Sequence, residues 1–174
     1  MTDPDEADLS PEEILREAET AFSKAARLFA TGHQEKSIIA FTEALELYSQ
    51  VEGTERQRAD CLNNTGIVMY ALGHREEALD YYRQALDLYR ELPAPKQQQA
   101  DCLNCIGTAL RRTESDKEAV AAYRQALDLY RDLPGSERDR AACSYNISAA
   151  LHKTGRHEEA LAFYQQAQEV SPPA

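Results

Sequence analysis

The nine residues YRQALDLYR occur twice in this chain, at 82–90 and again 41 positions later at 123–131. Four columns of small, aromatic or apolar residues recur at the same offset. They are Phe41, Tyr82, Tyr123 and Tyr164; Ala44, Ala85, Ala126 and Ala167; Ser37, Ala78, Ala119 and Ala160; and Ile38, Leu79, Val120 and Leu161. A fixed period of roughly 20 to 50 residues is typical of a solenoid, in which each unit buries its apolar face against its neighbours. The 174 residues therefore hold four units in one domain.

Each unit is predicted to be two helices joined by a tight turn. In residues 75–91 the small and apolar residues recur at steps of three and four, the period of one helical face. Gly73 suits the left-handed turn that ends the preceding helix. The predicted helices span 11–30, 34–50, 55–71, 75–91, 96–112, 116–132, 137–153 and 157–170. The sequence thus predicts an all-α chain.

Helix starts are marked by capping patterns. Ser10-Pro11-Glu12-Glu13 has a serine cap, a proline at the first helical position and a glutamate at the third. Ser115 with Glu118, and Ser136 with Asp139, predict similar boxes for two later helices.

The net charge of −11 is concentrated near the N-terminus. Residues 1–20 hold eight acids against Arg16 alone, a net −7, so the remaining residues carry −4. We expect residues 1–10 to be an acidic, disordered head and residues 11–171 to be a single domain, with units at about 14–54, 55–95, 96–136 and 137–171. A nearly balanced body argues against binding of nucleic acid, which requires a basic surface.

Neither a membrane span nor a secretory signal is expected. The longest apolar run, 67–72, is far shorter than the roughly 18 residues of a spanning helix. The N-terminal MTDPDEADLS carries acids where a signal has basic and then apolar residues. We therefore expect a cytoplasmic protein whose four cysteines are reduced.

Catalytic and metal chemistry have little support in the sequence. Cys61, Cys102 and Cys143 lie 41 apart and are expected to form one buried structural column. Cys102 and Cys105 form a CxxC pair, but a zinc site needs two further ligands that the sequence does not supply at suitable spacing. Gly32, Gly73 and Gly155 are accounted for by turns, and no nucleophile is paired with a base. We expect no cofactor, no metal and no enzymatic activity.

The repeated columns resemble those of the tetratricopeptide repeat. The family pattern places a large apolar and a small residue four apart on the first helix, then alanine, an aromatic residue and alanine on the second. These are Leu62, Gly66, Ala78, Tyr82 and Ala85 in unit two, and Leu103, Gly107, Ala119, Tyr123 and Ala126 in unit three. The common unit has about 34 residues, so these 41-residue units are lengthened. They resemble those of kinesin light chains and of adaptors with Leu-Gly-Asn repeats.

The resemblance implies a right-handed superhelical solenoid of four helix-turn-helix units. In this fold the first helix of each unit lines a concave groove that holds a partner segment, and the small column lets paired helices approach closely. Units one and four depart from the pattern. Ser148 replaces the glycine in unit four, where Leu161, Tyr164 and Val170 are expected to be partly exposed.

The resemblance also implies which side chains line the groove. The candidates are Asn63, Asn64, Ile67, Tyr70, Asn104, Thr108, Arg111, Arg112, Tyr145, Asn146, His152 and Lys153. The four asparagines predict a partial ladder that grips a peptide backbone, although solvated asparagine is an alternative. The cations predict an acidic ligand, although helix C-termini attract cations for dipole reasons alone. The aromatic residues of the groove, Phe22, Phe29, Tyr70 and Tyr145, suit apolar pockets, although internal packing is an alternative for Phe22 and Phe29.

The functional prediction is a non-catalytic protein-protein interaction module or adaptor that binds a partner peptide or helix. Two alternatives stay open: a chaperone that holds an unfolded or secreted client, and a scaffold that self-assembles through its uncovered C-terminal helix. We expect a protein or peptide partner, one with acidic residues if the cations bind it, and neither nucleic acid nor a membrane.

Overall fold

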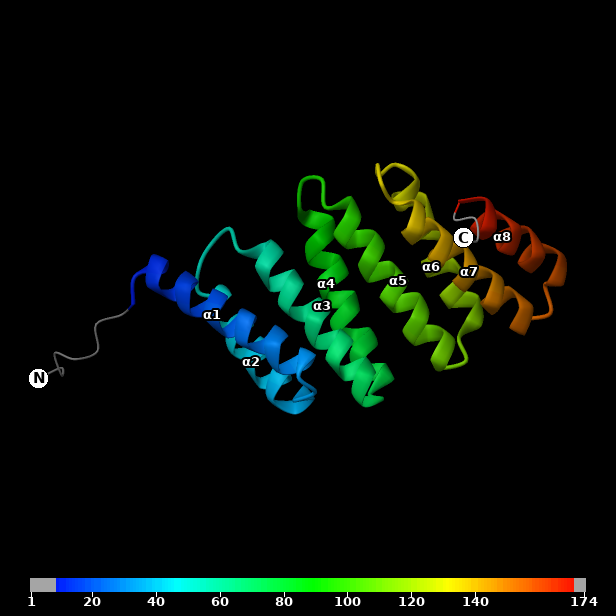
Figure 1. Cartoon of the computed structure of the whole chain (residues 1–174). Coiled ribbons are helices and arrows are strands. Elements are labelled where there is room, and N and C mark those ends of the chain that lie inside the picture. The colour runs from blue at the N-terminus through cyan, green and yellow to red at the C-terminus, as the bar shows by residue number, and fades with distance from the viewer. Residues whose placement is uncertain (1–8, 171–174) are drawn as a thin grey trace, which may run out of the picture.

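The structure, a computed structural model, describes residues 9–170, and these form eight α-helices. Their bounds are α1 Pro11–Ala30, α2 Gln34–Tyr48, α3 Glu55–Leu72, α4 Arg75–Glu91, α5 Lys96–Arg112, α6 Asp116–Arg131, α7 Glu137–Lys153 and α8 His157–Val170. The helices pack as four successive pairs, each pair against the next, so that α1 and α8 lie at opposite ends of the row (Figure 1). The predicted all-α solenoid is confirmed, and each helix ends within two residues of its predicted position.

The capping predictions fared differently at different helices. Ser10 and Glu13 form the predicted box, because the Ser10 backbone N–H donates to Glu13 Oε2 at 2.9 Å while the Glu13 N–H donates to Ser10 Oγ at 3.3 Å. Neither Ser115 nor Ser136 makes a side-chain cap, so both of those predictions were wrong. Ser136 Oγ instead donates to the carbonyl oxygens of Tyr130 and Leu133, which closes the turn from α6.

The first helices of the units form the inner side of the stack. Direct contacts join α3 to α5 and α5 to α7, and in each case they add to the contacts through the intervening second helix. We call this row, formed by the solvent-facing sides of α3, α5 and α7, the inner face. Because the first and second helices of the units alternate along the stack, residues 41 positions apart lie at equivalent places on the corresponding helices of successive units. The inner face therefore presents the same column positions three times.

Glycine lies where the aromatic column packs in units two and three. A Cβ on Gly66 would lie 2.7 Å from the ring of Tyr82, and one on Gly107 would lie 2.7 Å from the ring of Tyr123. Both tyrosines are buried. The sequence argument assigned the small column to close helix approach. The space is in fact taken by the tyrosine ring, and we call this contact the glycine–tyrosine seam.

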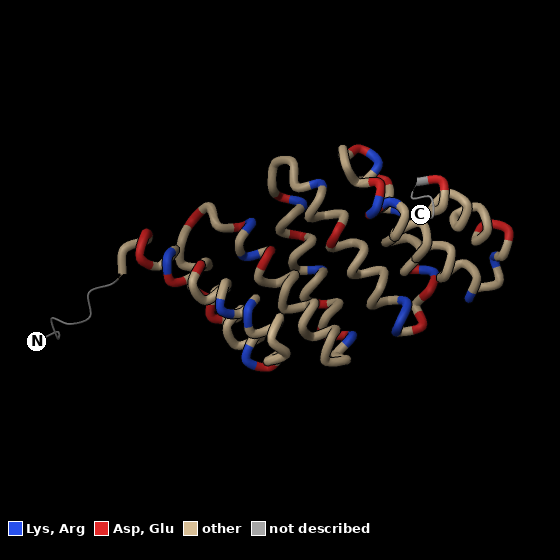
Figure 2. The backbone as a smooth tube through the Cα atoms, in the orientation of Figure 1, with Lys and Arg blue, Asp and Glu red and all other residues tan. Residues whose placement is uncertain are grey.

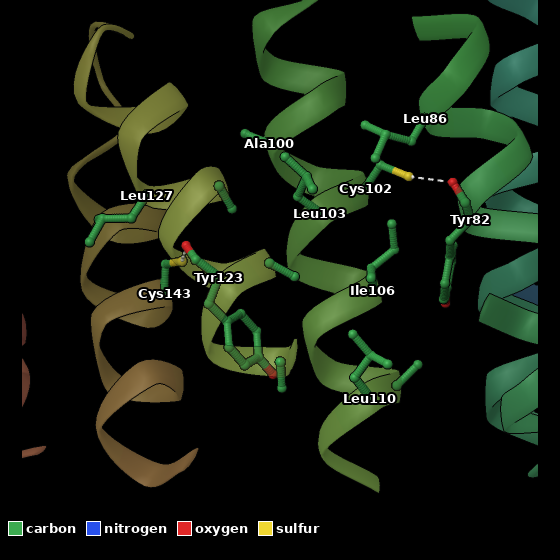
Figure 3. Packing of buried hydrophobic residues seen from close by; sticks show 14 of the residues in the cluster. Tyr82, Leu86, Ala100, Cys102, Leu103, Ile106, Leu110, Tyr123, Leu127 and Cys143 are labelled. Atoms are coloured by element: carbon green, nitrogen blue, oxygen red, sulfur yellow. Dashed lines mark hydrogen bonds between the residues drawn. The ribbon is translucent and has the colours of Figure 1, made fainter. Parts of the chain in front are cut away.

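Successive units are joined by polar contacts as well as apolar ones. Cys102 Sγ donates to the Tyr82 carbonyl at 3.1 Å, and Cys143 Sγ donates to the Tyr123 carbonyl at 3.0 Å (Figure 3). Cys61, the third member of the column, is also buried, as predicted. Burial raises the pKa of the Cys61 and Cys143 thiols to about 12. The cysteine column is thus part of the interface between units and is protonated at neutral pH.

The surface carries both signs of charge on all four helix pairs (Figure 2). In the part of the chain that the structure describes, no helix is both long enough and apolar enough to cross a membrane. Residues 1–8 of the predicted acidic head, and the side chain of Val170, lie outside the described residues.

Candidate partner-binding face

The twelve candidate residues lie on α3, α5 and α7, and none of them is buried. Tyr145, Arg112, His152 and Lys153 are exposed, while the other eight are half-buried. The column spacing of 41 residues places them on equivalent turns of neighbouring helices. The structure therefore brings them onto the inner face, but their side chains are engaged to different extents.

The asparagines form a shorter ladder than the sequence suggests. Asn146 Nδ2 on α7 lies 3.4 Å from Asn104 Oδ1 on α5, so these two amides meet across the helix boundary. Asn64 Nδ2 donates to the carbonyl of Asp60 in its own helix at 2.8 Å. Asn63 Oδ1 is enclosed and finds no hydrogen-bond partner in the described structure. Only the Asn104–Asn146 pair thus links neighbouring helices.

The four predicted cations differ in what they contact. Lys153 Nζ lies 2.9 Å from Asp116 Oδ2, and Asp116 is buried at the start of α6. His152 Nδ1 lies 3.2 Å from Nδ1 of His157. Within residues 9–170, neither Arg111 nor Arg112 forms an ion pair. The available cations are therefore these two arginines at the C-terminal end of α5.

Arg111 is held in place by its neighbours. Burial raises the pKa of Tyr123, and the Arg111 guanidinium beside the hydroxyl partly offsets that rise. The Tyr123 hydroxyl donates to Thr108 Oγ1 at 3.0 Å, and Thr108 Oγ1 donates to the Asn104 carbonyl at 2.9 Å. Thr108 therefore acts as an internal link rather than a free donor. The Arg111 Nε is enclosed and finds no acceptor in the described structure.

Ile67 and Tyr70 lie at the edge of the core. Both are half-buried and pack against the main apolar cluster. This packing does not favour the open apolar pocket predicted for Tyr70. Tyr145 differs, because it is 58% exposed and its ring centroid lies 6.4 Å from that of Tyr164 on α8.

A hollow of about 500 Å³ opens beside Tyr145, between α7 and α8. Tyr145 was among the residues predicted to suit an apolar pocket, but the contribution of α8 to that pocket was not predicted. Its lining residues are Tyr145, Ser148, Ala149, His152, His157, Ala160, Leu161 and Tyr164. The signal in the sequence was present, since Ser148 stands where two other units have glycine. The sequence alone did not show that a hollow lies beside this serine.

The described residues include no cluster of metal ligands on the inner face. Among the described residues, no three histidine, cysteine or acidic side chains are grouped to hold a metal ion. Burial raises the pKa of the Cys105 thiol to about 11, the result expected of an unactivated cysteine.

Comparisons with known proteins agree with this architecture. A family model described as tetratricopeptide repeat matches residues 17–91 and 98–172. The crystal structure of BtubC (BKLC) from P. vanneervenii superposes with a TM-score of 0.83 at 21% identity, over 95% of this chain and 66% of that one. A crystal structure of MamA gives a TM-score of 0.72 at 15% identity, over 92% of this chain and 84% of that one. At these identities the likeness concerns the fold.

The family model covers most of the chain, in two blocks of two units each. This chain spans just under two thirds of the length of BtubC. No match was found among curated proteins. The repeat model and the stacked helix pairs nevertheless agree. The chain belongs to the tetratricopeptide repeat family, whose repeats form protein-protein interaction or scaffold modules.

Proposed function

We propose that the protein is a non-catalytic adaptor that binds an extended, acidic segment of a partner protein along its inner face. The observation that carries the proposal is the state of Arg111 and Arg112. They are adjacent cations at the end of α5, and no carboxylate of the described residues pairs with either. Lys153, the remaining lysine or arginine among the candidates, already forms an ion pair with Asp116. Two unpaired guanidinium groups favour a carboxylate ligand.

The Asn104–Asn146 pair supplies the second element. An amide side chain offers both a donor and an acceptor, so it can pair with a peptide backbone without reading its sequence. The long 3.4 Å separation of these amides means that a backbone group inserted between them replaces a weak contact. Backbone pairing at these amides and charge pairing at Arg111 and Arg112 would then hold one segment across α5 and α7.

The fold supports this assignment through its rigidity. The inner-face residues project from helices rather than loops, and Thr108 and Tyr123 hold the Arg111 region in place through hydrogen bonds. A preorganised surface costs less ordering entropy on binding than a mobile one. We place the protein in the cytoplasm, where four free thiols would stay reduced.

The test is a selection from a random peptide display library, followed by affinity measurements on the enriched peptides. We expect the wild type to enrich peptides rich in Asp and Glu. These peptides should bind the Arg111→Glu/Arg112→Glu variant at least tenfold more weakly, which corresponds to a loss of about 1.4 kcal/mol of binding free energy. The matched control is Lys36→Glu/Lys117→Glu. It makes the same change in net charge at exposed positions of α2 and α6.

The control separates local binding from overall charge. Retention by Lys36→Glu/Lys117→Glu and loss by the arginine variant would place binding on the inner face. Equal loss in both variants would mean that net charge alone decides, and equal retention would place the ligand elsewhere. Far-ultraviolet circular dichroism of each variant checks that the helices persist. Equal loss or equal retention in the two variants would contradict the proposal.

A further inference from the structure

The hollow beside Tyr145 lies in unit four, between α7 and α8. In this unit the column that holds Gly66 and Gly107 carries Ser148. Among the described helices, none covers the outer side of α8. In units two and three, the glycine leaves room for the tyrosine ring, because a Cβ there would lie 2.7 Å from ring atoms. Ser148 has that Cβ. Its hydroxyl also donates to the Ala160 carbonyl on α8 at 2.7 Å, which fixes the side chain between the paired helices. A tyrosine ring placed as in units two and three would therefore approach this Cβ more closely than van der Waals contact allows.

Tyr164 is more exposed than the other tyrosines of its column. Its side chain is 42% exposed, whereas Tyr82 and Tyr123 in the same column are 2% and 0% exposed. Leu161 is 56% exposed, whereas Leu79 and Val120 in its column are buried. Among the described helices α8 packs mainly against α7, which contributes to both exposures. The Tyr164 ring also meets the Tyr145 ring of α7, with centroids 6.4 Å apart.

These exposed side chains border an apolar hollow at the end of the inner face. Tyr145, Tyr164 and Leu161 form its apolar walls, and its volume of about 500 Å³ accommodates a large side chain. Tyr145 and His152 belong both to the hollow and to the candidate inner-face residues. The hollow is thus continuous with the surface that carries Asn146, one residue further along α7.

A second copy stacked head to tail does not fit this hollow. Three columns of residues on α3, α5 and α7 face the preceding unit. The first holds cysteine, the second threonine or isoleucine, and the third valine or alanine. The same columns in α1 hold Thr20, Lys24 and Arg27, all of them exposed. A head-to-tail copy would bury Arg27 and the Lys24–Glu43 ion pair against Leu161 and Tyr164, and burial of charged groups is costly. The N-terminal end of the row is polar in the manner of a capping repeat.

We propose that the hollow receives a bulky apolar side chain, such as leucine or phenylalanine, from the same acidic segment that binds Arg111 and Arg112. This inference rests on the proposed function, because it assigns the neighbouring position of one bound segment. The two arginines at the end of α5 supply complementarity to the acids, and the hollow on α7 and α8 supplies an apolar anchor site. Specificity then depends on an acidic group and an anchor in one segment, not on charge alone.

The probes are fluorescein-labelled Gly-Ser peptides that contain a Glu-Glu pair, with or without one Leu or Phe scanned through the remaining positions. We expect the wild type to bind the best anchored peptide about tenfold more tightly than the peptide with Glu-Glu alone, which is a typical gain for burying one such side chain. Fluorescence anisotropy at low ionic strength measures both affinities.

Ser148→Gly is the decisive variant, and Ser148→Ala is its matched control. Glycine restores the residue of units two and three, so Tyr164 is expected to return to its seam and fill the hollow. The anchor preference should then fall below about twofold, while binding of the unanchored Glu-Glu peptide is unchanged. Alanine keeps the Cβ and removes only the hydroxyl, so the preference should persist. Arg112→Glu should weaken all of the peptides alike.

The outcomes separate the two proposals. Binding of Glu-Glu peptides without an anchor preference, or a preference that survives Ser148→Gly, overturns the anchor site and leaves the acidic-segment proposal standing. A wild type that binds no acidic peptide overturns both. Sedimentation velocity adds a further check: a concentration-dependent dimer that Leu161→Glu abolishes would assign the hollow to a second copy, and that result also overturns the anchor site.

Discussion

Units two and three close their helix pairs with a glycine and a tyrosine ring, whereas units one and four close theirs with a hydroxyl. In unit one, Ser37 Oγ on α2 donates to the Ala25 carbonyl on α1 at 2.8 Å. In unit four the direction is reversed, since Ser148 Oγ on α7 donates to the Ala160 carbonyl on α8 at 2.7 Å. The repeat thus keeps its helix pairing with two different seams, one apolar in the interior and one polar at the ends.

The difference teaches what the small column does. Phe41 is buried in unit one even though Ala25 carries a Cβ, and its ring meets Phe22 edge to face with centroids 5.3 Å apart. An aromatic residue can therefore be accommodated without glycine when the next unit covers it. In unit four both conditions fail together, because Ser148 has a Cβ and the described chain ends with α8 uncovered. The hollow requires this combination.

The largest effect is expected from removing the ring of an interior seam. Tyr123 is 0% exposed, so Tyr123→Ala should lower the free energy of unfolding by about 3–5 kcal/mol, as for other buried aromatic side chains. Tyr164→Ala removes the same ring from a half-open position, and we expect a loss under about 1 kcal/mol. Urea denaturation followed by circular dichroism measures both. Similar losses for the two variants would show that the interior and terminal seams are equally packed.

A smaller effect, with a reversal of sign, is expected from Gly107→Ala. The new Cβ would lie 2.7 Å from the Tyr123 ring, and such overpacking typically costs about 1–3 kcal/mol. Once Tyr123→Ala has removed the ring, the same change should stabilise the helix by about 0.5–1 kcal/mol, because alanine is the better helix former. The double-mutant cycle therefore tests whether the ring, rather than the opposing helix, requires glycine. Destabilisation of equal size in both backgrounds would point to helix approach instead.

The fold was accessible from the sequence because one interaction pattern is written several times. Columns at a spacing of 41 residues, such as Tyr82 with Tyr123, average out local ambiguity and identify both the helices and their buried faces. The cap predictions that failed, at Ser115 and Ser136, depend on single hydroxyls. At Ser136 two nearby carbonyls compete for the donor, and pattern alone does not determine which acceptor is used.

The site was less accessible, because its state depends on contacts between different columns. The sequence grouped Lys153 with Arg111 and Arg112 as cations at helix ends. The turn between α7 and α8 brings Lys153 within 2.9 Å of Asp116, a residue 37 positions earlier that is buried at the start of α6. Asn64 likewise uses its amide on the carbonyl of Asp60. Neither contact follows from residue type or from the repeat, so sequence reasoning could nominate the inner face but not its free groups.

The smallest effect is expected from the terminal hydroxyl of unit one. Ser37 is 0% exposed and its hydroxyl makes one hydrogen bond, to the Ala25 carbonyl, whose loss should cost about 1 kcal/mol in Ser37→Ala. Alanine is the residue of this column in the other three units, so the new side chain fits the helix pairing without a clash. Ser148→Ala should cost less, because Ser148 is half-buried and water can satisfy the Ala160 carbonyl. Urea midpoints at constant slope measure the two losses. If Ser37→Ala instead stabilises the protein, the hydrogen bond from the Ser37 hydroxyl does not contribute to the stability of unit one.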